Sequence, residues 1–242
     1  MKPIYIISPL TLAALAIGAT PSFGDGPSNS EPSQAPAPYV QNHASDSHWN
    51  GLYLGATIGT AFMGDDVVGV TPSSGPSQNV GEFEQGGFSG ELLAGYRWRT
   101  GQIVFGPEVS FSAGNIGDDF DDGTNSGDTQ LTYALGLRVK AGVLLNEEDT
   151  LLFAMAGMSH ASFDYAVTAP LASGSMALED SFTTTGYVFG VGAEKKLSER
   201  LSVTGSVEYS NYGKTQLTDG AGNTTLATPE FYSAKLGLNM SF

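Results

Sequence analysis

Apolar and polar residues alternate with a period of two along several long stretches of the chain. In the range 230–242, Tyr232, Leu238 and Phe242 fall on one face of an extended strand, and Lys235 falls on the other. This last strand, which ends on Phe242, would leave the edge of its sheet without a hydrogen-bonding partner. Pairing with the first strand would close the sheet into a barrel and cover that edge.

Reading the whole chain for this period predicts eight strands of about 11 to 15 residues each. Strands of soluble proteins average about 5 to 6 residues, whereas a tilted strand needs about 9 to 11 residues to cross the hydrocarbon core of a bilayer. The lengths therefore favour strands that cross a membrane. The predicted strands lie at 49–62, 87–99, 102–112, 129–143, 150–164, 183–197, 200–212 and 230–242.

Two of these segments indicate most clearly which side chains share a face. In 129–143, the face expected toward lipid carries Leu131, Tyr133, Leu135, Leu137, Val139, Ala141 and Val143. In 200–212, the corresponding face carries Leu201, Val203, Val207 and Tyr209. The segment 150–164 does not alternate well, so its facing stays open.

The connections between the predicted strands alternate between short and long. Short turns are expected around 100–101, 146–149 and 198–200. The long connections, rich in Gly, Ser, Thr, Asn and Asp, are 63–86, 113–128, 165–182 and 213–229. Short turns on one side and long loops on the other, with an even number of strands, are typical of bacterial outer-membrane barrels. The pattern predicts an all-β, eight-stranded, antiparallel, up-and-down transmembrane β-barrel.

Aromatic residues near the ends of the strands fit the two interfacial girdles of such a barrel. On the short-turn side they are Trp49, Trp98 and Phe242, and on the loop side they are Phe62, Phe88, Phe111, Phe163, Phe182 and Tyr232. The alternative is that some of them are ordinary core residues. We expect most of them to face the membrane interface.

The first residues have the pattern of a secretory signal. Lys2 precedes an apolar stretch from Ile4 to Ala19, and Ser22-Phe23-Gly24 has the small-x-small form of a cleavage site. A transmembrane helix is the competing interpretation, but the stretch is short and Pro9 interrupts it. Residues 1–24 are therefore predicted to be a signal peptide of an exported protein.

The range 25–48 is rich in Pro, Ser and Ala and has few large apolar residues, as flexible linkers do. The barrel domain is then expected at 49–242. The chain has no cysteine, which excludes a disulfide framework, thiol chemistry and a thiolate metal site. Its net charge of -15 with only 10 basic residues argues against binding to nucleic acid.

Several short motifs, in this order along the chain, carry a family resemblance. They are Trp49-Asn50-Gly51-Leu52-Tyr53-Leu54-Gly55, Gly86-Gly87, Gly95-Tyr96-Arg97-Trp98, Phe105-Gly106-Pro107-Glu108-Val109 and the terminal Phe242. Together they resemble the porin-family outer-membrane β-barrel proteins, small eight-stranded relatives of the OmpA membrane domain that include surface antigens of alphaproteobacteria. The resemblance covers about 49–242. It implies an integral outer-membrane protein with a structural or surface role and brings no catalytic residues and no cofactor.

The resemblance also implies partners. Outer-membrane lipids and lipopolysaccharide would surround the barrel, and the barrel-assembly machinery would insert it. The C-terminal assembly signal is then expected at Leu238, Met240 and Phe242. No C-terminal peptidoglycan-binding domain comes with the resemblance.

On the face opposite the lipid the strands carry charged residues, which we expect to point into the lumen. An eight-stranded barrel is just wide enough for its side chains to fill it, so these charges should pair with one another. A plug of structural ion pairs is the favoured interpretation, and a gated or narrow channel is the alternative. The predicted lumen residues are Glu91, Arg97, Arg99, Glu108, Arg138, Lys140, Glu194, Lys196, Glu208 and Lys235.

Acidic residues are concentrated in the long connections, where Lys214 is the only base. Like charges at this density repel one another unless cations bridge them, so divalent cations are the partners that these loops would attract. The run 118–123 lacks the spacing of an EF-hand, and a solvated acidic loop is the simpler interpretation. The main predicted residues of the acidic external loops are Asp65, Asp66, Asp118, Asp119, Asp121 and Asp122.

One pair of residues raises the question of catalysis. On a strand, His160 and Ser162 project from the same face and would be within reach of each other as base and nucleophile, as in lipid A deacylases. The Ser-Asn that would follow the histidine in a closer match is absent, and a polar pair near the outer end of the strand is the simpler interpretation. No histidine cluster for a metal is visible.

These observations predict a protein of the cell outer membrane that is not an enzyme. Its expected role is structural, supporting the integrity of the envelope and presenting acidic loops at the surface. The alternatives are a small-solute porin that prefers cations and, third, an enzyme that modifies the acyl chains of lipid A.

Overall fold

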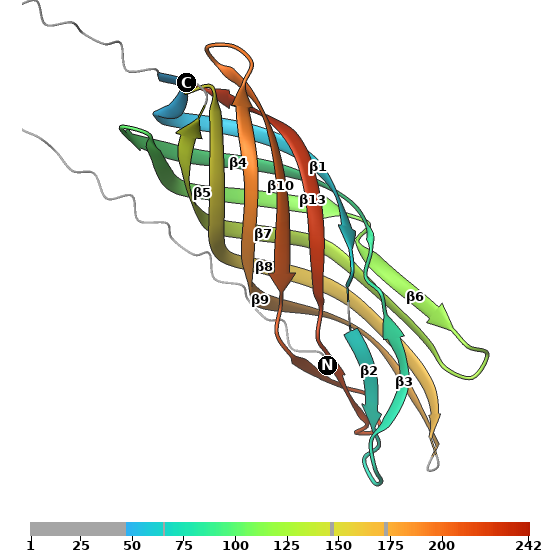
Figure 1. Cartoon of the computed structure of the whole chain (residues 1–242). Helices are drawn as coiled ribbons and strands as arrows, with labels where there is room; N and C mark the ends of the chain where they lie inside the picture. Colours follow the sequence, from blue (N-terminus) through green and yellow to red (C-terminus); the bar gives the residue numbers. More distant parts are fainter. Residues whose placement is uncertain (1–46, 65, 146–147, 172–173) are drawn as a thin grey trace, which may run out of the picture. The chain divides into compact units, whose positions relative to one another are not determined.

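The computed structural model describes residues 47–64, 66–145, 148–171 and 174–242. The predicted signal peptide 1–24, nearly all of the predicted linker 25–48, and Asp65 lie outside the described residues. A short 3-10 helix, η1 (Ser47–Trp49), precedes a chain of antiparallel strands (Figure 1). None of the described helices is long and apolar enough to cross a membrane.

The predicted β-barrel is confirmed: eight long antiparallel strands of the described chain close into a barrel. Each of these strands pairs with the next one along the chain, and the last pairs with the first. They are β1 (Gly51–Phe62), β4 (Gly87–Thr100), β5 (Ile103–Gly114), β7 (Ser126–Leu145), β8 (Thr150–Leu171), β9 (Gly174–Lys196), β10 (Leu201–Asn211) and β13 (Glu230–Ser241).

The barrel closes through β13, which corresponds to the last predicted strand at 230–242. β13 pairs with β1 from Tyr53 opposite Ser241 to Phe62 opposite Tyr232. The amide of the terminal Phe242 donates to the carbonyl of Leu52 at 3.0 Å. The edge of the last strand is therefore covered by the first, which leaves the barrel wall without an exposed edge at this point.

The long connections are largely β-structure, although their composition suggested loops. β7, β8 and β9 continue well beyond the barrel at the end opposite the short turns (Figure 1). Together with the shorter strands they form what we call the external cap. The shorter strands are β2 (Asp66–Thr71), β3 (Gln78–Phe83), β6 (Gly117–Asp121), β11 (Thr215–Thr218) and β12 (Thr224–Ala227).

The external cap has an apolar core of its own. A second sheet, in the order β11-β12-β2-β3, contributes Val68 and Val70, and the β8–β9 hairpin contributes Phe163 and Met176. Their side chains are at most 1% exposed. Burial of a large apolar side chain stabilises a fold by about 1.5–3 kcal/mol, so these residues hold the long connections in one packed arrangement.

Asp66 belongs to this packed core and not to an exposed acidic loop, so its prediction as a surface charge is wrong. Its side chain is fully buried, and its Oδ1 accepts hydrogen bonds from the Thr228 amide at 2.9 Å and the Thr228 hydroxyl at 2.7 Å. A buried carboxylate needs such donors. Asp66 therefore joins the first long connection to the last.

A β-bulge in β7 makes the predicted facing of Leu131 wrong. The pairing of β7 with β8 shifts register between Leu131 and Tyr133. On the turn side of the shift, Leu135 and Leu137 face outward as expected, whereas Leu131 is 2% exposed and packs in the cap core. One extra residue reverses the alternation, so a single sequence pattern could not hold across the barrel and the cap.

Three of the predicted girdle residues are also placed differently. Trp49, Phe163 and Phe182 are buried, with exposures of 0%, 1% and 8%. Phe163 stacks on Phe182 within the cap core, with ring centroids 5.6 Å apart. The remaining predicted girdle residues face outward, namely Phe62, Phe88, Trp98, Phe111, Tyr232 and Phe242.

The structure defines the facing of β8, which the sequence pattern left open because both faces of the strand carry apolar residues. Leu151 and Phe153 point into the barrel and are buried, while Leu152 and Ala154 point outward. The inward residues pack in a small cluster with Trp49. Because this part of the lumen wall is apolar, hydrophobicity does not alternate along the sequence here, although the side chains still alternate between the inner and outer faces.

The bulge can be tested by single-cysteine labelling, because the chain has no cysteine of its own. We expect Leu131→Cys to be protected from a membrane-impermeant maleimide and Gln130→Cys to react, since only the latter is exposed. Thr132→Cys, also exposed, is the second positive control. Rapid labelling at position 131 and protection at position 130, in folded protein, would contradict the bulged register.

Candidate functional site

The lumen of the barrel holds the candidate site. Because alternate residues of a strand point inward, the strands direct eight of the ten predicted charges into the interior. Four are carboxylates and four are cations, and in each ion pair among them the side chains are at most 11% exposed. They are Glu91, Arg97, Glu108, Arg138, Lys140, Glu194, Glu208 and Lys235.

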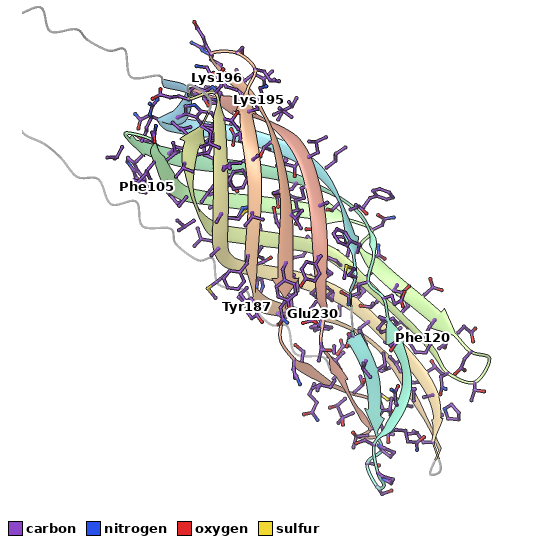
Figure 2. The ribbon with its side chains drawn as sticks, in the orientation of Figure 1. Phe105, Phe120, Tyr187, Lys195, Lys196 and Glu230 are labelled. Carbon is purple, nitrogen blue, oxygen red and sulfur yellow. The ribbon has the colours of Figure 1, made fainter. Side chains whose placement is uncertain are left out.

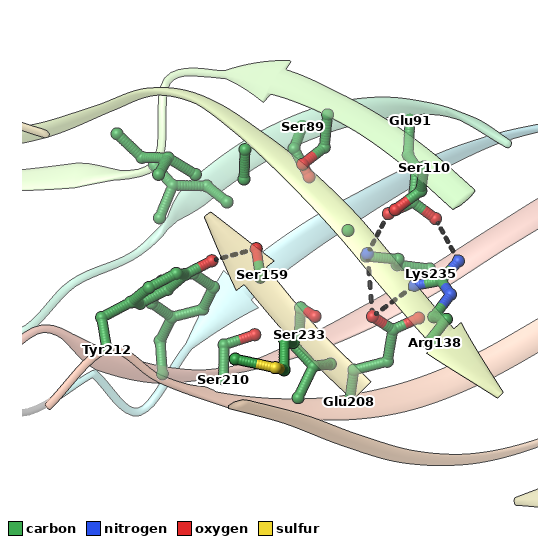
Figure 3. A pocket seen from close by; sticks show the side chains of 18 residues that line it. Ser89, Glu91, Ser110, Arg138, Ser159, Glu208, Ser210, Tyr212, Ser233 and Lys235 are labelled. Atoms are coloured by element: carbon green, nitrogen blue, oxygen red, sulfur yellow. Dashed lines mark hydrogen bonds and ion pairs between the residues drawn. The ribbon is translucent and has the colours of Figure 1, made fainter. Parts of the chain in front are cut away.

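Arg138 on β7 is the centre of the larger group of charges (Figure 3). Its Nη2 lies 2.7 Å from Glu91 Oε1 on β4, and its Nη1 lies 3.4 Å from Glu208 Oε2 on β10. Its Nε donates to Glu108 on β5. One guanidinium therefore bonds carboxylates on three other strands, which its planar fork of donors allows.

Two lysines complete this group. Lys235 Nζ on β13 lies 2.8 Å from Glu91 Oε2 and 2.9 Å from Glu208 Oε2. Lys140 Nζ lies 2.9 Å from Glu108 Oε2. Each carboxylate thus has at least two cationic contacts, as an ionised group in a region with little water requires. We call these six residues the central ion network.

A second, smaller ion pair lies nearer the short turns. Arg97 Nη2 donates to both oxygens of Glu194, at 2.8 and 3.1 Å, and the hydroxyl of Ser202 donates to Glu194 at 2.5 Å. The guanidinium of Arg97 lies 3.7 Å from the ring centroid of Tyr53 and 5.4 Å from that of Trp49. The rings cover a face of the cation that would otherwise need water.

Tyr53 links the two groups of charges. Its hydroxyl donates to Glu108, and its ring lies beneath Arg97. Gly95 on the neighbouring strand leaves the room for this ring, since a Cβ there would collide with it. The sequence analysis named Tyr53 only within a motif of the family resemblance and did not place it in the lumen. Its inward parity, shared with Thr57, was the available signal.

Beyond the central ion network, toward the cap, lies a small polar chamber of about 40 Å³ (Figure 3). Tyr212 lines it on the cap side, and its hydroxyl lies 3.0 Å from the hydroxyl of Ser159. A polar cavity of this size has room for water, since one water needs about 10–15 Å³ by this measure. The serines that line the chamber are Ser89, Ser110, Ser112, Ser159, Ser210 and Ser233.

The helix η1 covers the opposite mouth of the lumen. Trp49 is fully buried, and its Nε1 donates to the carbonyl of Glu148 in a short turn at 2.7 Å. The ring of His48 packs edge-on against Trp49, and His48 Nδ1 lies 3.1 Å from the carbonyl of Glu199 in another turn. The chain before β1 therefore binds to two turns and fills the space between them.

Arg99 and Lys196 lie at the rim and not in the two groups of charges. Arg99 forms an ion pair with Glu148, whose side chain is 44% exposed, and donates from Nε to the carbonyl of Gly101 at 2.9 Å. Lys196 is the half-buried last residue of β9. Both residues have inward parity, but the ends of the strands reach solvent.

In the predicted acidic run of the second long connection, Asp118 and Asp122 accept hydrogen bonds from backbone amides. Asp122 Oδ1 accepts from the amides of Thr124 at 2.8 Å and Asn125 at 2.6 Å, and the hydrogen bonds from Asn125 lower the pKa of Asp122. Asp118 accepts from the Glu84 amide at 2.7 Å, and Asp119 and Asp121 are exposed. Within the described residues no group of three or more His, Cys, Asp or Glu side chains is placed to hold a metal ion.

His160 and Ser162 point away from the lumen. His160 Nδ1 lies 2.9 Å from the Thr185 hydroxyl on β9, and Asp164 accepts from the Ser181 hydroxyl at 2.7 Å. The histidine is thus engaged across the strands with a threonine and not along its strand with Ser162. The three predicted assembly-signal residues, Leu238, Met240 and Phe242, are exposed on the outer face at 49%, 45% and 58%.

The central ion network should make a large contribution to stability. Replacing Arg138 with Met leaves three buried carboxylates with only two lysines, so we expect the free energy of unfolding to fall by about 3–5 kcal/mol. Arg99→Met, at the exposed rim, should cost less than about 1 kcal/mol. Urea unfolding of the refolded barrel in lipid vesicles, followed by heat-dependent gel mobility, measures both. Equal effects of the two substitutions would contradict a buried network.

The barrel fold agrees with the similarities of the chain to known proteins. The chain is 28% identical over 199 residues to the 22 kDa outer membrane protein of Rhizobium leguminosarum bv. viciae, covering 80% of this chain and 78% of the relative. It is 23% identical over 225 residues to the 31 kDa outer-membrane immunogenic protein of Brucella melitensis, covering 88% of this chain and 90% of that protein.

Among solved structures, the outer membrane protein OprG of Pseudomonas aeruginosa has a similar fold. The TM-score is 0.58 at 12% sequence identity, and the match covers 81% of this chain and 98% of OprG. The family model described as the outer membrane protein beta-barrel domain matches residues 35–242. The chain therefore belongs to the outer membrane protein beta-barrel family and is a protein of the bacterial outer membrane.

Proposed function

We propose that this protein is a closed structural barrel that supports the integrity of the outer membrane and presents its folded external cap at the cell surface. The observation that carries the proposal is the central ion network, in which Arg138 ties β7 to β4, β5 and β10 across the lumen. A side chain bonded to three other strands blocks the middle of the barrel and braces its wall at the same time.

Two further layers support a lumen that does not conduct. On the periplasmic side Trp49 fills the mouth, and on the external side the cap core begins at Leu131, Tyr212 and Phe231. A solute would have to pass an aromatic plug, a charge network with balanced sign and an apolar core in series. An open pore needs a continuous aqueous path, which such layers oppose.

The proposed partners follow from the location and the surface. Outer-membrane lipids and lipopolysaccharide would contact the outward apolar face, and the barrel-assembly machinery would read Leu238, Met240 and Phe242, which are exposed near the periplasmic end of β13. Divalent cations near the lipid phosphates would screen the acidic residues of the cap, such as Asp119 and Asp121.

A small-solute porin is the second candidate, and the serine-lined chamber is the observation that favours it. Six serines line the chamber together with apolar residues such as Met158 and Val188, and Lys235 and Arg138 form part of the lining. Motion of either side chain toward other carboxylates would extend the polar space toward the periplasm. A lipid-modifying enzyme has weaker support, since His160 bonds Thr185 and the named relatives are outer membrane proteins.

Planar-bilayer recording separates the first two candidates. We expect folded wild-type protein to produce no stable conductance steps, because three layers of side chains occupy the lumen. A general porin inserted into the same bilayer is the positive control for the recording. Reproducible steps that disappear in a Glu108→Gln/Arg138→Gln variant of verified fold would make the protein a channel and overturn the proposal.

The structural role predicts a phenotype that does not depend on conduction. Cells of the source organism that lack the chain should become more sensitive to detergents, and wild-type protein should restore resistance. Arg99→Met, which leaves the central ion network intact, should restore it equally well. If folded wild-type protein restores no more detergent resistance than an empty vector does, a structural contribution to the envelope is contradicted.

A further inference from the structure

A groove of about 700 Å³ runs across the outer wall of the barrel, on the face toward the bilayer. Its floor is formed by the small side chains of Ala141, Ala154 and Ala156, and its sides include Phe189 and Tyr209. Most lining side chains face outward, whereas Met155 and Glu208, which also border the groove, are buried and point into the barrel.

The groove follows two cross-strand rows of paired residues. One row runs from Val139 on β7 through Ala156 and Phe189 to Tyr209 on β10 and Tyr232 on β13. The ends of the row differ in depth because the strands are staggered around the barrel. Counted from the ends at the short turns, Tyr232 lies nine residues from Ser241 of β13, whereas Ala156 lies six residues from Thr150 of β8.

A lipid tail that lies in the groove would therefore run from the outer boundary of the membrane into its hydrocarbon core. This is the path of an acyl chain whose headgroup lies at the external boundary. Aromatic rings mark that boundary, since Tyr209 and Tyr232 have centroids 5.0 Å apart and Tyr209 and Tyr187 have centroids 6.3 Å apart. Tyrosine rings prefer the level of the lipid headgroups.

A carboxylate lies directly above this aromatic end of the groove. Glu230 Oε2 accepts a hydrogen bond from the Tyr209 hydroxyl at 2.8 Å, and the Asn211 amide also donates to it. Figure 2 shows Glu230 beside Tyr187 at the junction of barrel and cap, and both residues pair with Asn211 in the sheet. Within the described residues Glu230 has neutral donors and no ion pair.

We propose that this groove binds a lipid of the outer leaflet whose headgroup carries an amine. The acyl chain would fill the alanine floor, where methyl-sized side chains leave room that larger residues would occupy. The ammonium group would pair with Glu230, which two neutral donors already hold in place. A charge-assisted hydrogen bond to a half-buried carboxylate gives selectivity for a cation over an anionic headgroup.

Native mass spectrometry of the folded barrel in detergent tests the site. The probes are phosphatidylethanolamine and phosphatidylglycerol with the same acyl chains, added at equal concentrations. We expect wild-type protein to retain the ethanolamine lipid about fivefold more, in keeping with a partly exposed ion pair. Glu230→Gln keeps the size of the side chain and removes its charge, so it should bring the two lipids to equal retention.

Filling the floor tests the acyl chain separately. Ala156→Leu should lower the retention of both lipids, whereas Ala56→Leu, a likewise exposed outward position on β1 outside the groove, should have no effect. Heat-dependent gel mobility verifies folding of each variant, and Glu230→Gln alone decides the proposal if Ala156→Leu does not fold. Equal retention of both lipids by wild type, a preference for phosphatidylglycerol, or no effect of Glu230→Gln would overturn it.

Discussion

The pairing of Arg138 with three carboxylates is the interaction on which the rest of the structure depends. Eight strands enclose a lumen that side chains fill, so an inward charge cannot keep its hydration shell and must find its counterion on another strand. Glu91, Glu108 and Glu208 come from three different strands and meet at one guanidinium. The register of those strands is thereby tied together, because a shift by one residue would turn a charge toward lipid.

The same constraint explains the layers above and below the charges. Apolar residues close the lumen on both sides of the charges. Trp49 closes it at the mouth beside the short turns, and Phe163 and Phe231 belong to the cap core on the other side. The serine-lined chamber lies where the charged and apolar layers meet, and the hydroxyl pair of Ser159 and Tyr212 satisfies polar groups at that junction.

The period of two predicted the eight strands and the closure and put most of the buried charges on the inward face, because outward positions along the barrel wall share one apolar environment. It failed where that environment changes. Leu131 follows the pattern by sequence, but the bulge behind it turns the residue into the cap core. Phe163 and Trp49 look like girdle residues because an aromatic at a strand end has the same sequence signature whether it faces lipid or a plug.

The external cap could not be predicted from composition, because its stability comes from contacts between connections far apart in sequence. Gly81 illustrates this: a Cβ there would lie 2.7 Å from the ring of Phe120, so the glycine admits an aromatic from another connection. Asp66 acts similarly by bonding Thr228. Gly, Asp and Thr are typical of loops when the local sequence is considered alone. Between packed strands, glycine lets a neighbouring side chain approach closely, and a buried Asp accepts hydrogen bonds from a backbone amide and a threonine hydroxyl. The cap is therefore a packed structure that contacts between distant connections hold on a filled barrel.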